Sequence, residues 1–200
     1  MAKNNKTVDR IQAVWNILGG EDGIDRLLRG EIRVSEPERA WREQGGVIYF
    51  NVTSDGTTGK DWITRLERKN FRVGDSAQSV LRSSDFKPTD GVTYEIAVLK
   101  DMLFSDRDRI TKKIRAEADK RNLTKPNAEV ACLIREKFCD DDLEAMGLLW
   151  IVTMHEPINN FEGYPHLLSA YQSVNNSGGF DASRGNPYVR WGLSGFAFVV

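Results

Sequence analysis

The chain has 200 residues, of which 40% are hydrophobic, 28% are charged and 10% are aromatic, a composition that predicts a folded globular protein and argues against disorder. Its 28 basic and 29 acidic side chains leave a formal net charge of −1, so the chain has no general electrostatic attraction to nucleic acid or to an anionic membrane surface. No apolar run reaches the roughly 18 residues that a membrane-spanning helix requires.

The start of the sequence and its cysteines indicate the cellular compartment. Met1 to Lys6 are polar and lead directly into an amphipathic pattern, so we expect no signal peptide and a cytoplasmic protein. Cys132 lies in the middle of a predicted helix and is seven positions from Cys139, which disfavours a disulfide between them. We therefore expect both thiols to be reduced.

Two short helices are predicted near the N-terminus. The first has an apolar face that recurs every three to four residues and ends at a pair of glycines. Its apolar residues are Val8, Ile11, Trp15 and Leu18, and the glycines are Gly19 and Gly20. The second helix is predicted to run through Ile24, Leu27 and Leu28 to Gly30.

The next region alternates between strand and helix patterns. Residues 47–52 are β-branched and aromatic and lie between glycine-containing turns, which predicts a strand. Trp62, Ile63 and Leu66 have helical spacing. Residues 95–100 are apolar enough to form a buried strand.

The pattern breaks at residues 84–92, which contain a proline and several turn residues. We therefore place a domain boundary there. It divides the chain into an N-terminal α/β region, residues 1–90, to which the sequence assigns no role, and a C-terminal domain, residues 91–200.

The C-terminal domain continues with mixed elements. Residues 108–121 predict a charged helix, residues 148–154 a strand and residues 196–200 a short terminal strand. Pro126 suits the first position of a further helix. That helix would bury Val130, Leu133, Ile134 and Phe138. Because strands and helices mix without a regular βαβ alternation, we predict an α+β fold.

A cluster of basic residues on the charged helix raises the alternative of a nucleic-acid-associated protein. These residues are Arg107, Arg109, Lys112, Lys113, Arg115, Lys120 and Arg121. Acidic residues are interleaved with them, which cancels much of the field and allows ion pairs between neighbouring turns. A solvated helix face is the favoured interpretation, so nucleic acid is not the expected partner.

Residues 56–61 (Gly-Thr-Thr-Gly-Lys-Asp) resemble a phosphate-binding loop but have two residues between the glycines where four are needed. A polar turn before the next helix is predicted instead. Asp140 to Asp142 do not continue into a calcium-binding loop, and they fit the start of a helix through Leu143 and Met146.

His155, His166 and Cys139 do not share a helix face that could hold a metal ion. We expect structural histidines, no metal and no cofactor. An enzyme of unrecognised type, with His155 and Glu156 as an acid–base pair, stays as an alternative.

The composition changes at Tyr164. From there to Val200 the chain has no lysine and no glutamate, and 16 of its 37 residues are Ser, Gly, Asn or Tyr. Tyrosine supplies rigid amphipathic contact area, and Ser, Gly and Asn supply adaptable hydrogen bonding, as in antibody-type binding surfaces. The alternative is a long loop that closes onto the fold. Residues 195–200 are apolar enough for a buried strand, which would anchor the segment at both ends.

Several short runs near the C-terminus carry a resemblance to a known family. They are Met154-His155-Glu156-Pro157-Ile158, Leu167-Leu168-Ser169, Pro187, Arg190-Trp191 and Gly195-Phe196-Ala197-Phe198-Val199-Val200. These runs resemble the C-terminal end of the variable proteins of diversity-generating retroelements, in which a reverse transcriptase miscopies template adenines into the target gene. The resemblance implies a C-type lectin-like fold for residues 91–200. It also implies variable residues on a solvent-facing surface that ends at a fixed strand beginning Gly-Phe.

The resemblance further implies which residues bind. Asparagine codons changed at their adenines yield Tyr, Ser, Gly, Val, Leu, Phe, Ala or Asp, and such residues fill positions 171–194. We therefore expect a ligand-binding protein, not an enzyme, with a macromolecular ligand that is a protein. The expected aromatic anchors are Tyr171, Phe180, Tyr188 and Trp191. The full set of candidate ligand-binding residues is Tyr171, Ser173, Asn175, Asn176, Phe180, Asp181, Ser183, Tyr188, Val189, Arg190, Trp191, Leu193 and Ser194.

Overall fold

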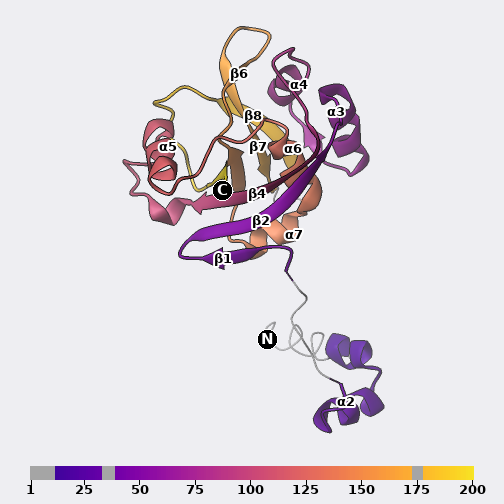
Figure 1. Cartoon of the computed structure of the whole chain (residues 1–200). Coiled ribbons are helices and arrows are strands. Elements are labelled where there is room, and N and C mark those ends of the chain that lie inside the picture. Colours follow the sequence, from indigo (N-terminus) through magenta and orange to yellow (C-terminus); the bar gives the residue numbers. More distant parts are fainter. Residues whose placement is uncertain (1–11, 33–38, 173–177) are drawn as a thin grey trace, which may run out of the picture. The chain divides into compact units, whose positions relative to one another are not determined.

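The computed structural model describes residues 12–32, 39–172 and 178–200, and the chain divides into two compact units, Met1–Arg39 and Ala40–Val200 (Figure 1). The domain boundary predicted near residue 90 is wrong. Strand β4 (Asp90–Lys100) begins at that point and pairs along its length with β2 (Val47–Asp55). The turn residues at 84–92 therefore connect a helix to a strand within one unit, and they do not separate two domains.

The first unit contains both predicted helices. Residues 12–18 are helical, and α2 spans Glu21–Leu28. Between them, the Gly20 N–H donates to the Trp15 carbonyl at 2.9 Å, and the Gly19 N–H donates to the Asn16 carbonyl at 3.2 Å. This is a Schellman motif, and it needs the positive φ of 86° that Gly19 adopts without strain. The predicted apolar residues Val8 and Ile11 lie outside the described residues.

The described residues of the second unit form a nine-stranded mixed sheet in the order β1-β2-β4-β9-β5-β7-β8-β3, with β6 beside β7. The remaining strands are β1 (Arg42–Gln44), β3 (Arg72–Val73), β5 (Trp150–Thr153), β6 (Ile158–Asn159), β7 (Pro165–Tyr171), β8 (Gly179–Arg184) and β9 (Gly195–Val199). The pairs β5–β9 and β3–β8 are parallel, and the other pairs are antiparallel. Strand β9 lies inside the sheet between β4 and β5, which confirms the predicted buried terminal strand.

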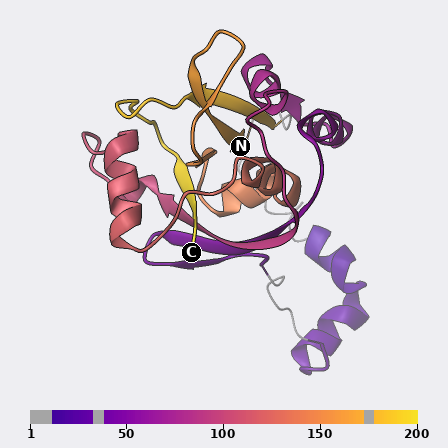
Figure 2. The ribbon, with the colours of Figure 1, turned by 45° about the horizontal axis from the view of Figure 1, so that its top comes forward.

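The larger of two apolar cores lies on one face of this sheet. Four helices contribute to it, namely α3 (Gly59–Arg68), α4 (Asp75–Leu81), α6 (Val130–Lys137) and α7 (Asp140–Ala145) (Figures 1 and 2). Trp62 and Leu66 of α3 meet strand residues such as Ile96 and Phe180 in this core. Burial of such large apolar side chains is the main favourable term in folding.

A smaller core lies on the opposite face of the sheet. Helix α5 (Thr111–Lys120) supplies Ile114 and Ala118, which are both buried. They share this core with Leu99 of β4 and Phe198 of β9. Figure 2 shows α5 on the side of the sheet away from α3, α4 and α6. The two faces are therefore covered unequally.

Helix α6 begins later than the sequence predicted. Pro126 is not its first residue, because the chain at this point is extended beside β9, where Thr124 and Val199 exchange two backbone hydrogen bonds of 2.8 and 2.9 Å. The helix starts at Val130, four residues after the proline. Its apolar positions are buried as predicted, and they are Val130, Leu133, Ile134 and Phe138.

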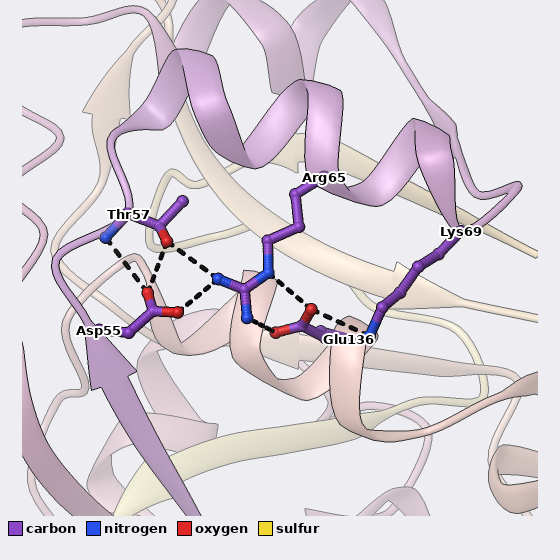
Figure 3. Close-up of polar contacts among 5 residues, drawn as sticks. All are labelled: Asp55, Thr57, Arg65, Lys69 and Glu136. Atoms are coloured by element: carbon purple, nitrogen blue, oxygen red, sulfur yellow. Dashed lines mark hydrogen bonds and ion pairs between the residues drawn. The ribbon is translucent and has the colours of Figure 1, made fainter.

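An ion-pair network connects α3 to β2 and α6 (Figure 3). The Arg65 Nε and Nη2 atoms donate to the two oxygens of Glu136 at 2.6 and 2.5 Å, and Lys69 pairs with the same carboxylate at 2.9 Å. Arg65 also donates to Asp55 and to the Thr57 hydroxyl. Hydrogen bonds from Arg65 and then Thr57 lower the pKa of Asp55. A bidentate pair of this kind fixes two elements in both distance and orientation.

Residues 56–61 form the predicted turn and helix start. The Thr58 hydroxyl accepts the Asp61 N–H at 3.3 Å and so caps the N-terminus of α3. The mixture of helices with a largely antiparallel sheet confirms the α+β class. Within the described ranges, no helix has both the length and the apolar character needed to cross a bilayer.

Candidate ligand-binding surface

Alternate residues of β5, β7 and β8 lie on the sheet face opposite α6. Val152 pairs with Ser169, which in turn pairs with Asp181, and Leu167 pairs with Ser183. Directly opposed residues of antiparallel strands project from the same face, so the register alone groups these side chains. Asp181 and Ser183 are half-buried. This face therefore brings predicted ligand-binding residues of β8 beside residues of β5 and β7.

An aromatic row crosses the same three strands. Trp150 and Tyr171 are cross-strand partners whose rings stack with centroids 4.5 Å apart and an interplanar angle of 23°. The Tyr171 ring then lies over Gly179 of β8, where a Cβ atom would come within 2.2 Å of it. Both aromatic residues are half-buried. Gly179 thus makes room for a partly exposed aromatic platform.

A pocket of about 390 Å³ adjoins this face. It is lined by Leu149, Trp150, Val152, Ser183, Trp191, Gly192, Leu193 and Ser194. Five of these eight residues come from the predicted segment 171–194, and the other three come from β5 and the residue before it. Its rim includes two exposed apolar side chains, Leu149 and Leu193. Concave sites with mainly apolar walls and a few polar groups are typical of ligand binding.

The loop between β8 and β9 is docked onto the start of α5. The N–H groups of Thr111 and Lys112 donate to the carbonyls of Val189 and Pro187 at 3.1 and 2.9 Å. These are N–H groups of the first helical turn, which have no partner within the helix. The loop backbone is therefore fixed, while Tyr188 on it is 75% exposed. Arg190 is also exposed, and Val189 is half-buried against the smaller core.

Trp191 and Ser194 belong to the scaffold more than to the exposed surface. The Trp191 indole N–H donates to the Thr111 hydroxyl at 3.0 Å, and its ring packs edge-on against Phe196 with centroids 6.3 Å apart. Trp191 is only 8% exposed, and Ser194 is buried as well. Both line the pocket, so the prediction that Trp191 contacts a ligand stays a prediction.

The structure contradicts the prediction that Phe180 contacts a ligand. Its side chain is fully buried in the larger core, on the face opposite Asp181 and Ser183. The reason is the two-residue period of a strand, which turns neighbouring side chains to opposite faces. Three further candidates, Ser173, Asn175 and Asn176, lie outside the described residues.

A buried arginine holds the end of β7. Arg135 of α6 donates to the Tyr171 carbonyl at 2.8 Å and to the Asp140 carboxylate at 3.0 Å. Burial lowers the pKa of Arg135, although the nearby Asp140 charge opposes this effect. Gly178, where the chain is described again, lies so near Asp140 that a Cβ would be 1.9 Å from a carboxylate oxygen. The Arg135–Asp140 pair therefore adjoins the chain on both sides of residues 173–177.

His155 and Glu156 do not form an acid–base pair. The His155 Nε2 atom accepts the Leu168 N–H at 2.9 Å, and Nδ1 is 2.7 Å from the Glu156 carbonyl oxygen, to which it donates as the neutral tautomer. Burial lowers the pKa of His155 from 6.5 to about 4. The Glu156 carboxylate is exposed and pairs with Lys125 at 2.6 Å. His155 is thus a structural histidine, as the sequence indicated.

The two cysteines and His166, the other residues considered for metal binding or catalysis, have structural roles or are buried. Cys139 caps α7, with its N–H donating to Asp142 at 2.9 Å, which confirms that the acidic run begins a helix. Cys132 is buried, and both cysteines are free, in agreement with the expected reduced thiols. His166 is buried, and its Nδ1 lies 2.8 Å from the Tyr164 carbonyl oxygen.

The basic residues around α5 are largely neutralised by acidic neighbours. Arg109 pairs with Asp101 and Asp106, Lys113 pairs with Asp108, and Lys120 and Arg121 pair with Glu117. Hydrogen bonds from Lys113 and then Ser105 lower the pKa of Asp108. This arrangement supports the interpretation of a solvated helix face.

Comparisons with known protein families, with curated proteins and with solved structures found no match for this chain. Three residues of the candidate surface, Leu149, Trp150 and Val152, were missed by the sequence analysis. They lie in an apolar run that reads as a buried strand, and only the register of β5 against β7 shows that Trp150 stacks on Tyr171. The spacing of Trp150 and Val152 by two residues is the pattern that places them on one face of a strand. Their neighbours are apolar too, so the sequence shows no alternation that would distinguish the two faces.

Proposed function

We propose that this chain is a ligand-binding protein whose binding surface combines the half-buried residues of β5, β7 and β8 with the loop between β8 and β9. The observation that carries the proposal is the 390 Å³ pocket, because five of its eight lining residues belong to the segment 171–194. That segment has the composition of a binding surface. It also resembles the diversified segment of the variable proteins of diversity-generating retroelements. Two independent lines, one of sequence and one of geometry, thus point to one region.

The same proposal includes a C-type lectin-like fold within the second unit, Ala40–Val200, and diversification by a retroelement. It is supported by β9, which begins Gly195-Phe196 and pairs with β4 and β5 directly after the candidate loop. Gly195 is required there, since a Cβ would lie 2.5 Å from the Val98 side chain. A fixed strand of this kind can hold a loop whose exposed residues change.

The proposed ligand is a protein in the cytoplasm. Two exposed apolar side chains, Leu149 and Leu193, line the pocket together with Trp150, which stacks on Tyr171. Tyr188 is exposed on the loop between β8 and β9. Apolar and aromatic side chains presented by a rigid framework are the usual energetic centre of a protein–protein interface. A site of this type needs no cofactor or metal, and the proposal assigns no catalytic step to it.

The experiment that tests the proposal is deep sequencing of this gene and its flanks in the source population. We expect substitutions to concentrate in codons 171–194, with adenines at the matching positions of a nearby repeat. The structure sharpens this expectation, because change should fall on Asp181, Ser183, Tyr188 and Leu193, and should spare Phe180 in the core. A uniform segment with no repeat nearby would remove the retroelement from the proposal.

A second measurement tests binding itself. Natural variants recovered by the sequencing would be displayed and selected against a panel of proteins from the same source. Selected variants should differ at the exposed positions and lose binding when Tyr188 and Leu193 are both changed to alanine. Thr93 and Thr53 on the distant β2–β4 pair, changed to alanine together, provide the control, because both are exposed and lie far from β8 in the strand order. Equal loss of binding in the control would show that the effect is not local to the proposed surface.

A further inference from the structure

The first unit exposes large apolar side chains on both of its helices. Val14, Trp15 and Ile17 belong to the helical residues 12–18, and Leu28 ends α2. Ile17 is 83% exposed and Leu28 is 78% exposed. Among the described residues 12–32, the one that is buried is Gly23, which has no side chain to bury. Residues 12–32 therefore present apolar side chains at their surface, and none of the apolar side chains described there is fully buried.

Such a unit needs additional burial to be stable. Helix α2, with eight residues, is too short to persist alone in water, because nucleation is unfavourable and few hydrogen bonds follow it. Units of below about 40 residues usually depend on disulfides, metals or oligomerisation. The two helices are closely fitted, since a Cβ at Gly23 would lie 1.5 Å from the Leu18 carbonyl oxygen. That fit fixes their geometry but leaves the four apolar side chains in solvent.

The charges on α2 favour a second copy of the same helix as the partner. Its first turn carries Glu21 and Asp22, its last turn carries Arg26, and Arg29 is its C-cap residue. Two α2 helices side by side in antiparallel orientation place the acidic end of each beside the basic end of the other. A parallel arrangement would bring like charges together. Glu31 pairs with both arginines, but these side chains are about half exposed, so the pairs exchange readily.

We propose that these exposed apolar side chains belong to the interface with a second copy of the chain, in a two-fold symmetric dimer that pairs the α2 helices antiparallel. A two-fold interface uses the same patch on both subunits, so the patch must be complementary to itself. The patch meets that requirement in two ways, through its apolar side chains and through the reversed charges along α2. The dimer does not depend on what the second unit binds, although it would present two ligand-binding surfaces together.

Sedimentation equilibrium of the full chain tests the proposal. We expect a dimer, and we expect Ile17→Asp to raise the dimer dissociation constant by at least about tenfold, as loss of a central apolar contact does. Asn16→Asp is the matched control, since it adds the same charge to the same helix at an exposed polar position and should leave the constant unchanged. A monomeric wild-type chain at the highest soluble concentration overturns the proposal, as does an Ile17→Asp chain that dimerises like the wild type.

Two charge variants test the pairing without removing apolar contacts. Arg26→Glu with Arg29→Glu makes α2 acidic at both ends, and Glu21→Arg with Asp22→Arg makes it basic at both ends. Each variant alone should dimerise more weakly than the wild type, and an equimolar mixture should form the mixed dimer. A mixture that associates no better than its components overturns the antiparallel pairing. Circular dichroism of each variant, compared with the wild type, identifies any loss of folding of the second unit.

Discussion

The two faces of strands β5, β7 and β8 differ in what they contact. On one face, Ile151, Leu168, Ala170 and Phe180 are buried in the larger core with α6. On the other face, Val152 and Leu167 are buried in the smaller core. Trp150 and Ser183 on this face are half-buried and line a pocket. Neighbouring residues of the same strands thus contribute to the core and to the pocket.

The difference shows how a binding surface can change without loss of the fold. In β8 the scaffold residue Phe180 and the surface residue Asp181 are neighbours in sequence, and the period of the strand separates their roles. A substitution at Phe180 removes core contacts, while one at Asp181 or Ser183 changes mainly what solvent or a ligand meets. Four predictions measure how complete this separation is.

The largest effect is expected at the inner face. Phe180→Ala should lower the free energy of unfolding by about 3–5 kcal/mol, because it opens a cavity in the core. Ser183→Ala, three residues along the same strand on the outer face, should change it by no more than about 0.5 kcal/mol. Urea unfolding of both variants makes the measurement. Equal losses would show that the two faces are not distinct.

The second prediction uses pH to test the buried hydrogen bond between His155 and the backbone of β7. In the folded state the pKa of His155 is lowered by burial from 6.5 to about 4. Between these pH values the unfolded chain binds a proton that the folded chain does not, so stability falls as the pH drops from 6.5 to 4. The loss from this group should approach about 3 kcal/mol.

The measurement for His155 is the free energy of unfolding at pH 7 and pH 4.5 in the wild type and in His155→Gln. Glutamine keeps an acceptor for the Leu168 N–H but does not titrate. The variant should therefore lose less stability on acidification than the wild type. The same pH dependence in both proteins would contradict a neutral buried His155.

The third prediction concerns the glycine beneath the aromatic platform. Gly179→Ala should destabilise the fold by about 1–3 kcal/mol, because its Cβ would overlap the Tyr171 ring and displace it from Trp150. Trp150 fluorescence should change together with stability. Gly192→Ala is the matched control, since no atom lies within 4 Å of a Cβ at that position. A similar loss in the control would mean that glycine acts here through backbone freedom alone.

The smallest effect is expected at the most exposed aromatic residue of the loop. Tyr188→Ala should change the free energy of unfolding by no more than about 0.5 kcal/mol, because its side chain is 75% exposed and the loop is held by backbone bonds to α5. Thermal unfolding compared with the wild type provides the measurement. A larger loss would assign Tyr188 to the scaffold and remove it from the proposed binding surface.

Local pattern was enough to predict most elements. The glycine pair after Leu18 ends a helix, residues 47–52 form a strand, and the acidic run after Cys139 begins a helix. The predictions were wrong where contacts between residues far apart in the sequence determine the local structure. Pro126 lies in extended chain because Thr124 pairs with Val199, and residues 84–92 do not divide domains because β4 pairs with β2. Neither pairing has a signal within the segment itself.

The sequence singled out the segment that supplies most of the pocket lining, but not which of its side chains are buried. Residues 164–200 differ from the rest of the chain in composition, because they lack lysine and glutamate and are rich in Ser, Gly, Asn and Tyr. This composition is what singled out the segment. It could not separate Phe180 and Trp191, which are buried, from Tyr188 and Leu193, which are exposed. All four are apolar or aromatic, and burial depends on what packs against each one. Trp150 was missed for the same reason, since its stacking partner lies 21 positions away.

The sequence by itself determined the α+β class, the short N-terminal helices, the buried terminal strand and the location of the polar C-terminal segment, because each follows from local composition and periodicity. Only the tertiary structure decided which strands are neighbours, which face of β8 is covered, and that β5 contributes to the pocket. The physical reason is that side-chain burial and strand register are fixed by contacts between residues far apart in the chain.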